Sequence, residues 1–204
     1  SSQLKMMNRT RKSFYKDIIH ITQIGELSEN GFWSKINYIQ GAKLKEHMLE
    51  LNSTGKEFTD YSVKMYNEQN DVFSKMANAA HELRRSGRKK ILIFVQFVED
   101  AYDLSLKIPG SIVVHGALSD KDRDAAVEGY KTSRYWCAIN VNVLGTGFDD
   151  PLIDGIVHGR LTNSVGIWYQ HVGRGVRIHP SKVDVDLIDF SGNFKRFGRV
   201  EDFT

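Results

Sequence analysis

The chain has 204 residues, of which 41% are hydrophobic and 26% are charged, and this composition excludes disorder as its main state. Lys and Arg together number 28 and Asp and Glu 25, so the net charge is +3, which permits a polyanionic partner without requiring one. The longest uninterrupted apolar runs, residues 91–95 and 135–139, have five residues each, which excludes a membrane-spanning helix, since that needs about 18.

The first ninety residues predict a small helical region. Apolar residues at helical spacing indicate a helix near the N-terminus: Phe14, Ile18 and Ile21. A short strand is expected at 36–39. A long amphipathic helix is expected to begin at Val72 and to end at Gly87.

A polar stretch divides the chain. Residues 51–60 are rich in Ser, Thr, Gly and Asn, which is typical of a linker. We therefore expect a domain boundary near residue 60, with a helical and linker segment at 1–60 and a second domain at 61–204.

From residue 91 onward, short apolar runs alternate with amphipathic segments, which is typical of a parallel sheet with crossover helices. The runs expected to form strands are 91–97, 112–115, 137–143, 153–158 and 183–190. Helices are expected at 98–108, after Ser119, which forms a capping box with Asp122, and at about 163–172. The order βαβαββαβ predicts an α/β fold, an open and mostly parallel sheet with helices on both faces.

The most informative part of the sequence is the stretch QHVGRGVR, residues 170–177. On a helix, steps of four and three residues would place Gln170, Arg174 and Arg177 on one face. Two guanidinium groups and an amide there would form a surface that reads phosphate. The two glycines disfavour helix and indicate that backbone or a ligand approaches closely. The alternative is a pair of surface arginines near a helix end, which the helix dipole favours.

A second informative stretch is VNVLGTGFDDP, residues 141–151, which leaves a strand, turns through two glycines and presents paired carboxylates. Ligands of open parallel sheets bind where strands end, so this turn is a candidate site. The alternative is an ordinary strand-end turn, because Pro151 disfavours a following helix interior and a third glycine is absent. A dinucleotide-binding enzyme is disfavoured, because residues 96–100 lack the glycine-rich fingerprint after the first long strand.

These two stretches, with Gln170 lying 19 residues after Pro151, resemble motifs V and VI of superfamily-two helicases. The strand at 91–95, followed by Ala101, is similar to motif IV of that family. The family's next conserved segment is matched by His115, Gly116 and Arg123. Residues 189–193, DFSGN, are similar to the segment after motif VI in helicases related to restriction-enzyme motor subunits and bacterial DNA-repair helicases.

The resemblance covers about residues 87–198 and implies the second RecA-like domain of an ATP-dependent helicase or translocase. The implied partner is single- or double-stranded nucleic acid, DNA in preference to RNA. ATP with Mg²⁺ would be bound mainly by a first RecA-like domain, because the Gly55-Lys56 pair has Glu50 where a phosphate loop needs its first glycine. The chain begins at Ser1 rather than Met, so we expect a fragment of a longer protein that is inactive alone.

The resemblance also implies roles for individual residues. Arg174 and Arg177 would reach the γ-phosphate of ATP as arginine fingers, and Gln170 would orient them or the attacking water. Gly147 and Asp149 would complete the nucleotide side of the site. The residues expected to contact the nucleic-acid backbone are Thr146, His115, Gly116 and Arg123.

Two positions depart from the family pattern. Gly145 stands where related motifs usually carry Thr or Ser, so the hydroxyl contact to nucleic acid would fall to Thr146. Asp120 stands where many relatives have Gln, three residues before Arg123. The sequence therefore leaves open whether Arg123 contacts the backbone or is simply solvated.

Several other features have competing interpretations. Five cations within residues 84–90 predict either a nucleic-acid track or a solvated helix end that compensates the helix dipole. Core packing is favoured over base stacking for Trp136, Trp168 and Tyr169. Asp189 is expected to be structural rather than a magnesium ligand.

The single cysteine, Cys137, excludes an internal disulfide and has no zinc-site spacing with the seven histidines. We therefore expect no structural metal and a reducing, cytoplasmic compartment. The rival function from another class is a non-catalytic module that binds nucleic acid or another partner with a helicase-like fold. An upstream phosphate loop would separate the two.

Overall fold

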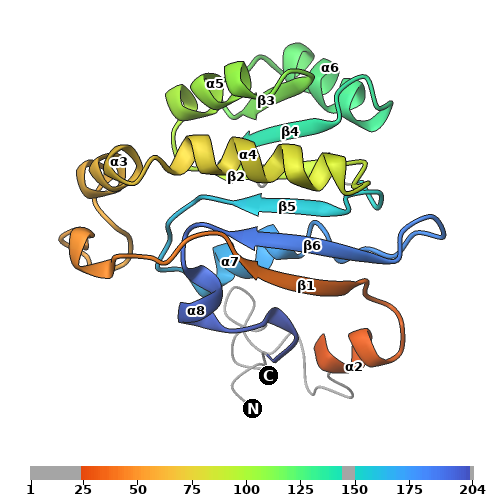
Figure 1. Ribbon diagram of the computed structural model, residues 1–204, viewed down its shortest axis with the longest axis horizontal. Helices are drawn as coiled ribbons and strands as arrows, with labels where there is room; N and C mark the ends of the chain where they lie inside the picture. The colour runs from red at the N-terminus through yellow and green to blue at the C-terminus, as the bar shows by residue number, and fades with distance from the viewer. Residues whose placement is uncertain (1–23, 144–149, 203–204) are drawn as a thin grey trace, which may run out of the picture.

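The computed structural model describes residues 24–143 and 150–202, which form an open α/β sheet covered by helices on both faces (Figure 1). In these residues six strands lie in the order β1-β6-β5-β2-β4-β3, and each neighbouring pair is parallel. The strands are β1 (Lys35–Gln40), β2 (Ile91–Val95), β3 (Ser111–His115), β4 (Cys137–Val141), β5 (Gly155–His158) and β6 (Asp184–Asp189). The predicted fold class is confirmed.

Strand β2 shows why the apolar runs form buried strands. It lies between β5 and β4 inside the sheet, helices pack on both faces of the sheet, and all five side chains are therefore buried. Ile91, Ile93 and Val95 contact one core, whereas Leu92 and Phe94 contact the other. The alternation follows the two-residue period of a strand.

The helices form two layers. The elements are α2 (Ile24–Glu29), α3 (Asp60–Gln69), α4 (Val72–Arg85), α5 (Val98–Lys107), α6 (Asp120–Lys131), α7 (Val165–Val172) and α8 (Asn193–Phe197), with short 3-10 turns η1 (Glu46–Met48) and η2 (Val200–Asp202). Helices α3, α4 and α5 pack on one core, and α6 and α7 pack on the other. Figure 1 shows α4 and α7 on opposite sides of the sheet. No helix in the described part of the chain is long and apolar enough to cross a membrane.

Local signals set several boundaries. At the start of α6, Ser119 Oγ accepts a hydrogen bond from Asp122 N at 3.1 Å, as the capping box predicts. Gly87 follows α4 with φ +102°, a left-handed conformation that favours glycine. Strands β2 and β4 each end two residues before the predicted end.

The sheet extends across the boundary that the sequence predicts near residue 60. Strand β1 pairs with β6, with Lys35 opposite Asp184 and Gln40 opposite Asp189. The strand itself is predicted, but its place in the main sheet is not. The division into 1–60 and 61–204 stays a prediction, and the helix expected around Phe14 lies outside the described residues.

Candidate functional site

Helix α7 carries the beginning of the QHVGRGVR stretch. Its N-cap is Ser164, whose Oγ accepts from Ile167 N at 3.4 Å, and the helix ends at Val172. Gln170 is exposed on the last turn, and Arg174 is half-buried in the turn that follows. The candidate phosphate-reading groups therefore lie where α7 ends.

The single helical face predicted for the glutamine and both arginines is wrong beyond Val172. The helix stops before Gly173, and Arg177 lies in the irregular segment beyond, where it is exposed. Ser34 fixes this segment, because its N–H donates to Val176 O at 2.7 Å and its hydroxyl donates to Arg177 O at 3.0 Å. Glycine disfavours helix, and these contacts stabilise the alternative conformation.

The close approach predicted from the two glycines is confirmed at Gly175. A Cβ at this position would lie 2.8 Å from Ile156 Cδ1 and 3.1 Å from Val185 Cγ2. The backbone after α7 therefore rests directly on β5 and β6, and any side chain at this position would push it away.

A chain of buried polar side chains lies beneath α7. His171 Nδ1 is 2.8 Å from His158 Nε2, and His158 Nδ1 is 3.0 Å from Ser191 Oγ. Ser191 Oγ in turn donates to Asp189 Oδ1 at 2.6 Å. All four residues are buried. Burial lowers the pKa of His158 to about 3 and the pKa of His171 well below its usual range, so both rings are neutral.

The glycine-rich stretch is described only at its ends. Thr146, Gly147 and Asp149 lie outside the described residues. At the far end, Asp150 is firmly held, because it accepts from Lys90 Nζ at 2.5 Å and from Leu152 N at 2.9 Å.

The basic run at 84–90 is neither a continuous track nor a simple solvated helix end. Arg88 binds Asp184 and Asp186 at the start of β6, with N–O distances of 2.6 and 2.7 Å. Lys90 is buried and also donates to the Tyr130 carbonyl oxygen at 2.9 Å. Both predicted interpretations are wrong for these two cations, because carboxylates distant in sequence attract them inward.

The predicted nucleic-acid residues at β3 and α6 differ in accessibility. The His115 ring is buried, and its Nε2 lies 3.1 Å from Tyr102 Oη. Gly116 is exposed, and nothing lies within 4 Å of a Cβ built on it. Arg123 Nη2 lies 2.5 Å from Asp120 Oδ1, so the residue that departs from the family pattern pairs with this arginine.

The aromatic residues behave largely as predicted. Trp168 is fully buried, and Trp136 and Tyr169 pack against the two cores while partly buried. Among the residues that the structure describes, no group of three or more His, Cys, Asp or Glu side chains could hold a metal ion.

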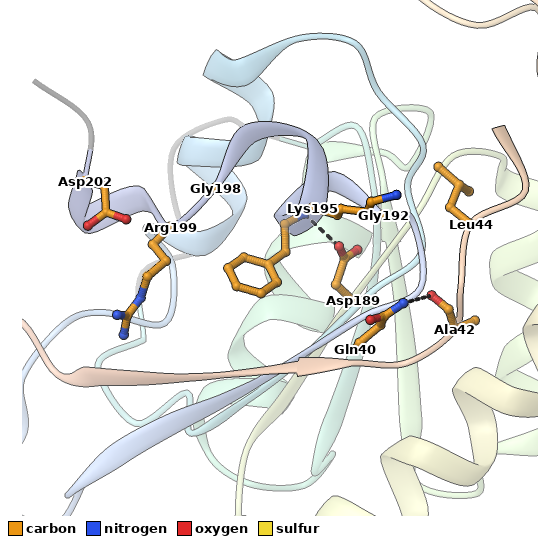
Figure 2. Close-up of a pocket in the computed structure, with 10 residues that line it drawn as sticks. Gln40, Ala42, Leu44, Asp189, Gly192, Lys195, Gly198, Arg199 and Asp202 are labelled. Atoms are coloured by element: carbon orange, nitrogen blue, oxygen red, sulfur yellow. Dashed lines mark hydrogen bonds between the residues drawn. The ribbon is translucent and has the colours of Figure 1, made fainter.

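A hollow of 360 Å³ that the sequence does not predict lies beside α8 (Figure 2). Its lining residues are Gln40, Ala42, Leu44, Asp189, Gly192, Phe194, Lys195, Gly198, Arg199 and Asp202. Figure 2 shows Asp189 in the wall, where its Oδ2 accepts from Phe194 N at 2.8 Å. Segments near residues 40 and 190 meet only in the folded sheet, so no local pattern indicates this hollow.

Comparison with known proteins gives a family match. Residues 74–179, slightly more than half of the chain, match the model of the helicase conserved C-terminal domain. The chain is 30% identical over 98 residues to the ATP-dependent RNA helicase rok1 of Aspergillus terreus, which covers 43% of this chain and 13% of rok1. It is 29% identical over 119 residues to irc3 of Schizosaccharomyces pombe, assigned as a mitochondrial ATP-dependent helicase, covering 54% of this chain and 19% of irc3. The chain thus spans less than a fifth of either relative.

Two solved structures share the fold across nearly the whole chain. A fragment assigned to the HsdR subunit of a type I restriction enzyme from Vibrio vulnificus YJ016 has a TM-score of 0.67 at 21% identity, and the alignment covers 100% of this chain and 40% of that one. A Saccharomyces cerevisiae Dbp5 variant bound to RNA and ADP BeF3 has a TM-score of 0.60 at 15% identity, covering 98% and 46%. At these identities the likeness shows the fold.

Proposed function

The chain belongs to the helicase conserved C-terminal domain family, and on that premise we propose that it is the second RecA-like motor domain of an ATP-dependent superfamily-two helicase or translocase. The observation that carries the proposal is the turn after α7. The family match runs to residue 179 and so includes Gln170, on the last turn of this helix, and Arg174 and Arg177, in the segment that follows it.

The side chains at this turn fit a polyphosphate ligand. Gln170 and Arg177 are exposed, Arg174 is half-buried, and a guanidinium group stays charged at any physiological pH. ATP, bound with Mg²⁺ mainly by a first RecA-like domain, would supply the phosphoryl group that is transferred to water. The two arginines would bind the γ-phosphate and offset its developing charge, a contribution of about 10³ to 10⁵ in rate. Gln170 would orient them or the attacking water.

We propose that the nucleic-acid side is formed where β3 and β4 end. The open backbone at Gly116 admits a phosphate, and Thr146 would supply a hydroxyl. Because the His115 ring is buried, His115 would contact nucleic acid through its main-chain atoms. Arg123 forms an ion pair with Asp120, so it would contact the nucleic-acid backbone either while keeping that pair or after breaking it. Gly147 and Asp149 would link this side to the nucleotide.

DNA is the proposed track, because residues 189–193 resemble the segment after motif VI in helicases related to DNA restriction and repair. The named relatives include RNA helicases, so the choice needs a direct test. Single-stranded DNA and RNA of one sequence would be compared by fluorescence anisotropy at several salt concentrations. Tighter DNA binding that weakens steeply with salt supports the proposal. Preference for RNA would overturn the assignment to DNA.

Motor function is tested by ATP hydrolysis. The 204-residue chain alone should not hydrolyse ATP, because it lacks a phosphate loop. Joined to the phosphate-loop domain of its own polypeptide, it should show nucleic-acid-stimulated turnover. Absence of turnover in the joined protein, with nucleic-acid binding intact, would favour the non-catalytic module instead.

A further inference from the structure

The buried polar chain beneath α7 connects the proposed catalytic turn to the end of β6. We propose that Asp189, Ser191 and His158 form a one-way hydrogen-bond chain that fixes His171 in a single tautomer, and that His158 is thereby a positioning residue for the turn that carries Arg174. The tautomer assignment is independent of the function proposed above. The positioning role of His158 in catalysis rests on that function.

The direction of the chain follows from its Asp189 end. Asp189 Oδ1 accepts from the Ser191 backbone N–H at 2.9 Å, and Oδ2 accepts from the Phe194 N–H at 2.8 Å, so both oxygens act as acceptors. An ionised carboxylate can only accept, and these backbone donors favour the ionised form, so the Ser191 hydroxyl, 2.6 Å from Oδ1, donates its proton to Asp189. With that proton committed, Ser191 Oγ can only accept from His158.

The same reasoning sets both imidazole rings. His158 carries its proton on Nδ1, which donates to Ser191 Oγ at 3.0 Å, so its Nε2 presents a lone pair. That lone pair accepts at 2.8 Å from His171, whose proton is therefore also on Nδ1. The donors all point from α7 toward Asp189.

The surroundings keep the rings neutral and in place. Phe94 stacks on the His171 ring at 3.9 Å and 8°, and Trp168 meets the His158 ring edge-on at 5.2 Å and 83°. His158 is 0% exposed and His171 1%, so charging either ring would carry a large desolvation cost. Rotation of either ring would leave buried donors or acceptors unpaired.

The His171 ring, held by this hydrogen-bond chain, lies at the point where α7 ends. Arg174 N donates to the His171 carbonyl oxygen at 3.2 Å, and Gly173 N donates to Tyr169 O at 2.8 Å. The helix has only eight residues, and glycines flank Arg174, so the local backbone is intrinsically soft. The His171 ring, held from below, supplies a fixed point three residues before the arginine. A small misplacement of a catalytic group can cost about a hundredfold in rate.

The first test is the tautomeric state, measured by ¹⁵N chemical shifts of histidine-labelled chain. We expect the Nδ1–H tautomer on both rings in the native chain. Ser191→Ala removes the acceptor of His158 together with the hydroxyl donor to Asp189. It should introduce the Nε2–H form on His158 and, through it, change the signal of His171. Ser62→Ala, which removes another buried serine hydroxyl that bonds Glu50 and Thr59, should change neither ring. An Nε2–H tautomer in the native chain, or unchanged shifts in Ser191→Ala, would overturn the inference.

The second test is ATP turnover in the protein joined to its phosphate-loop domain. Ser191→Ala and His158→Leu should lower kcat by about ten- to hundredfold with the KM for ATP nearly unchanged, whereas Ser62→Ala should not. His158→Gln, whose amide oxygen can still accept from His171, should restore much of the rate. Full activity of folded His158→Leu would overturn the positioning role. Full activity of Arg174→Lys would instead overturn the proposed function and leave the tautomer result standing.

Discussion

Lys90 Nζ lies 2.5 Å from Asp150 Oδ2, and the two side chains are 3% and 6% exposed. The lysine directly precedes β2, and the aspartate closes the glycine-rich stretch between β4 and β5. The Lys90 ammonium also donates to two carbonyl oxygens at the end of α6. This ion pair therefore fixes the end of the glycine-rich stretch to the centre of the sheet.

Breaking this pair should strongly destabilise the fold. Lys90→Met leaves the Asp150 carboxylate buried without its partner, and we expect the free energy of unfolding to fall by about 3–5 kcal/mol. The double variant Lys90→Met with Asp150→Asn should recover part of that loss. Urea unfolding measures both. Lys64→Met breaks an exposed pair with Glu99 and should leave the midpoint almost unchanged. Equal, small losses for the two lysines would contradict the prediction.

Replacing the arginines after α7 should impair catalysis without unfolding the protein. Lysine cannot reproduce the planar fork of Arg174 or Arg177, so either Arg→Lys variant should lower ATP turnover by orders of magnitude when the chain is joined to the proposed first RecA-like domain. Thermal melting of the same samples should show nearly native midpoints. Arg85→Lys, an exposed arginine on α4, is the matched control. If melting point and turnover fell together, the arginines would have a structural role instead.

Adding one methyl group at Gly175 should destabilise the sheet. The new Cβ of Gly175→Ala would press on Ile156 and Val185, and overpacking of this kind costs about 1–3 kcal/mol. Gly166→Ala, on the exposed side of α7, meets its nearest neighbour at 3.7 Å and should be neutral or slightly stabilising. Chemical denaturation compares the two, and an unchanged midpoint for Gly175→Ala would show that the backbone can move away freely.

Acid should weaken the fold through the buried histidines. The pKa of His158 is about 3 in the folded state and near its ordinary value of 6.5 when unfolded, because burial disfavours the charged ring. The unfolded chain therefore binds more protons below pH 6.5, and the free energy of unfolding should fall as pH decreases from 6.5 toward 3. The slope per histidine is at most about 1.4 kcal/mol per pH unit.

The histidine contribution is isolated by comparing variants. Burial raises the pKa of Asp189, which acts in the opposite direction, but this effect is common to the native chain and to His158→Leu. The native chain should therefore lose stability more steeply than His158→Leu between pH 6.5 and 4. Parallel pH profiles of the two proteins would show that His158 does not titrate on unfolding.

Much of the fold and part of the candidate site are determined by the sequence alone. The apolar run of β2 predicts a strand buried on both faces, and the Ser119 cap predicts where α6 begins. These signals are local, since strand period, helix propensity and capping act between residues a few positions apart. The QHVGRGVR stretch also identifies its family from adjacent residues, and the match over 74–179 agrees.

Only the tertiary structure decides which distant groups meet. Arg88 turns inward because Asp184 and Asp186 lie beside it, although they are almost a hundred residues away in sequence. His158 and His171 give no local signal, yet the sheet places them in contact with each other and with the end of β6. A buried charge or imidazole must find a partner, because leaving it unpaired costs several kcal/mol, and the sheet order determines which partner is within reach.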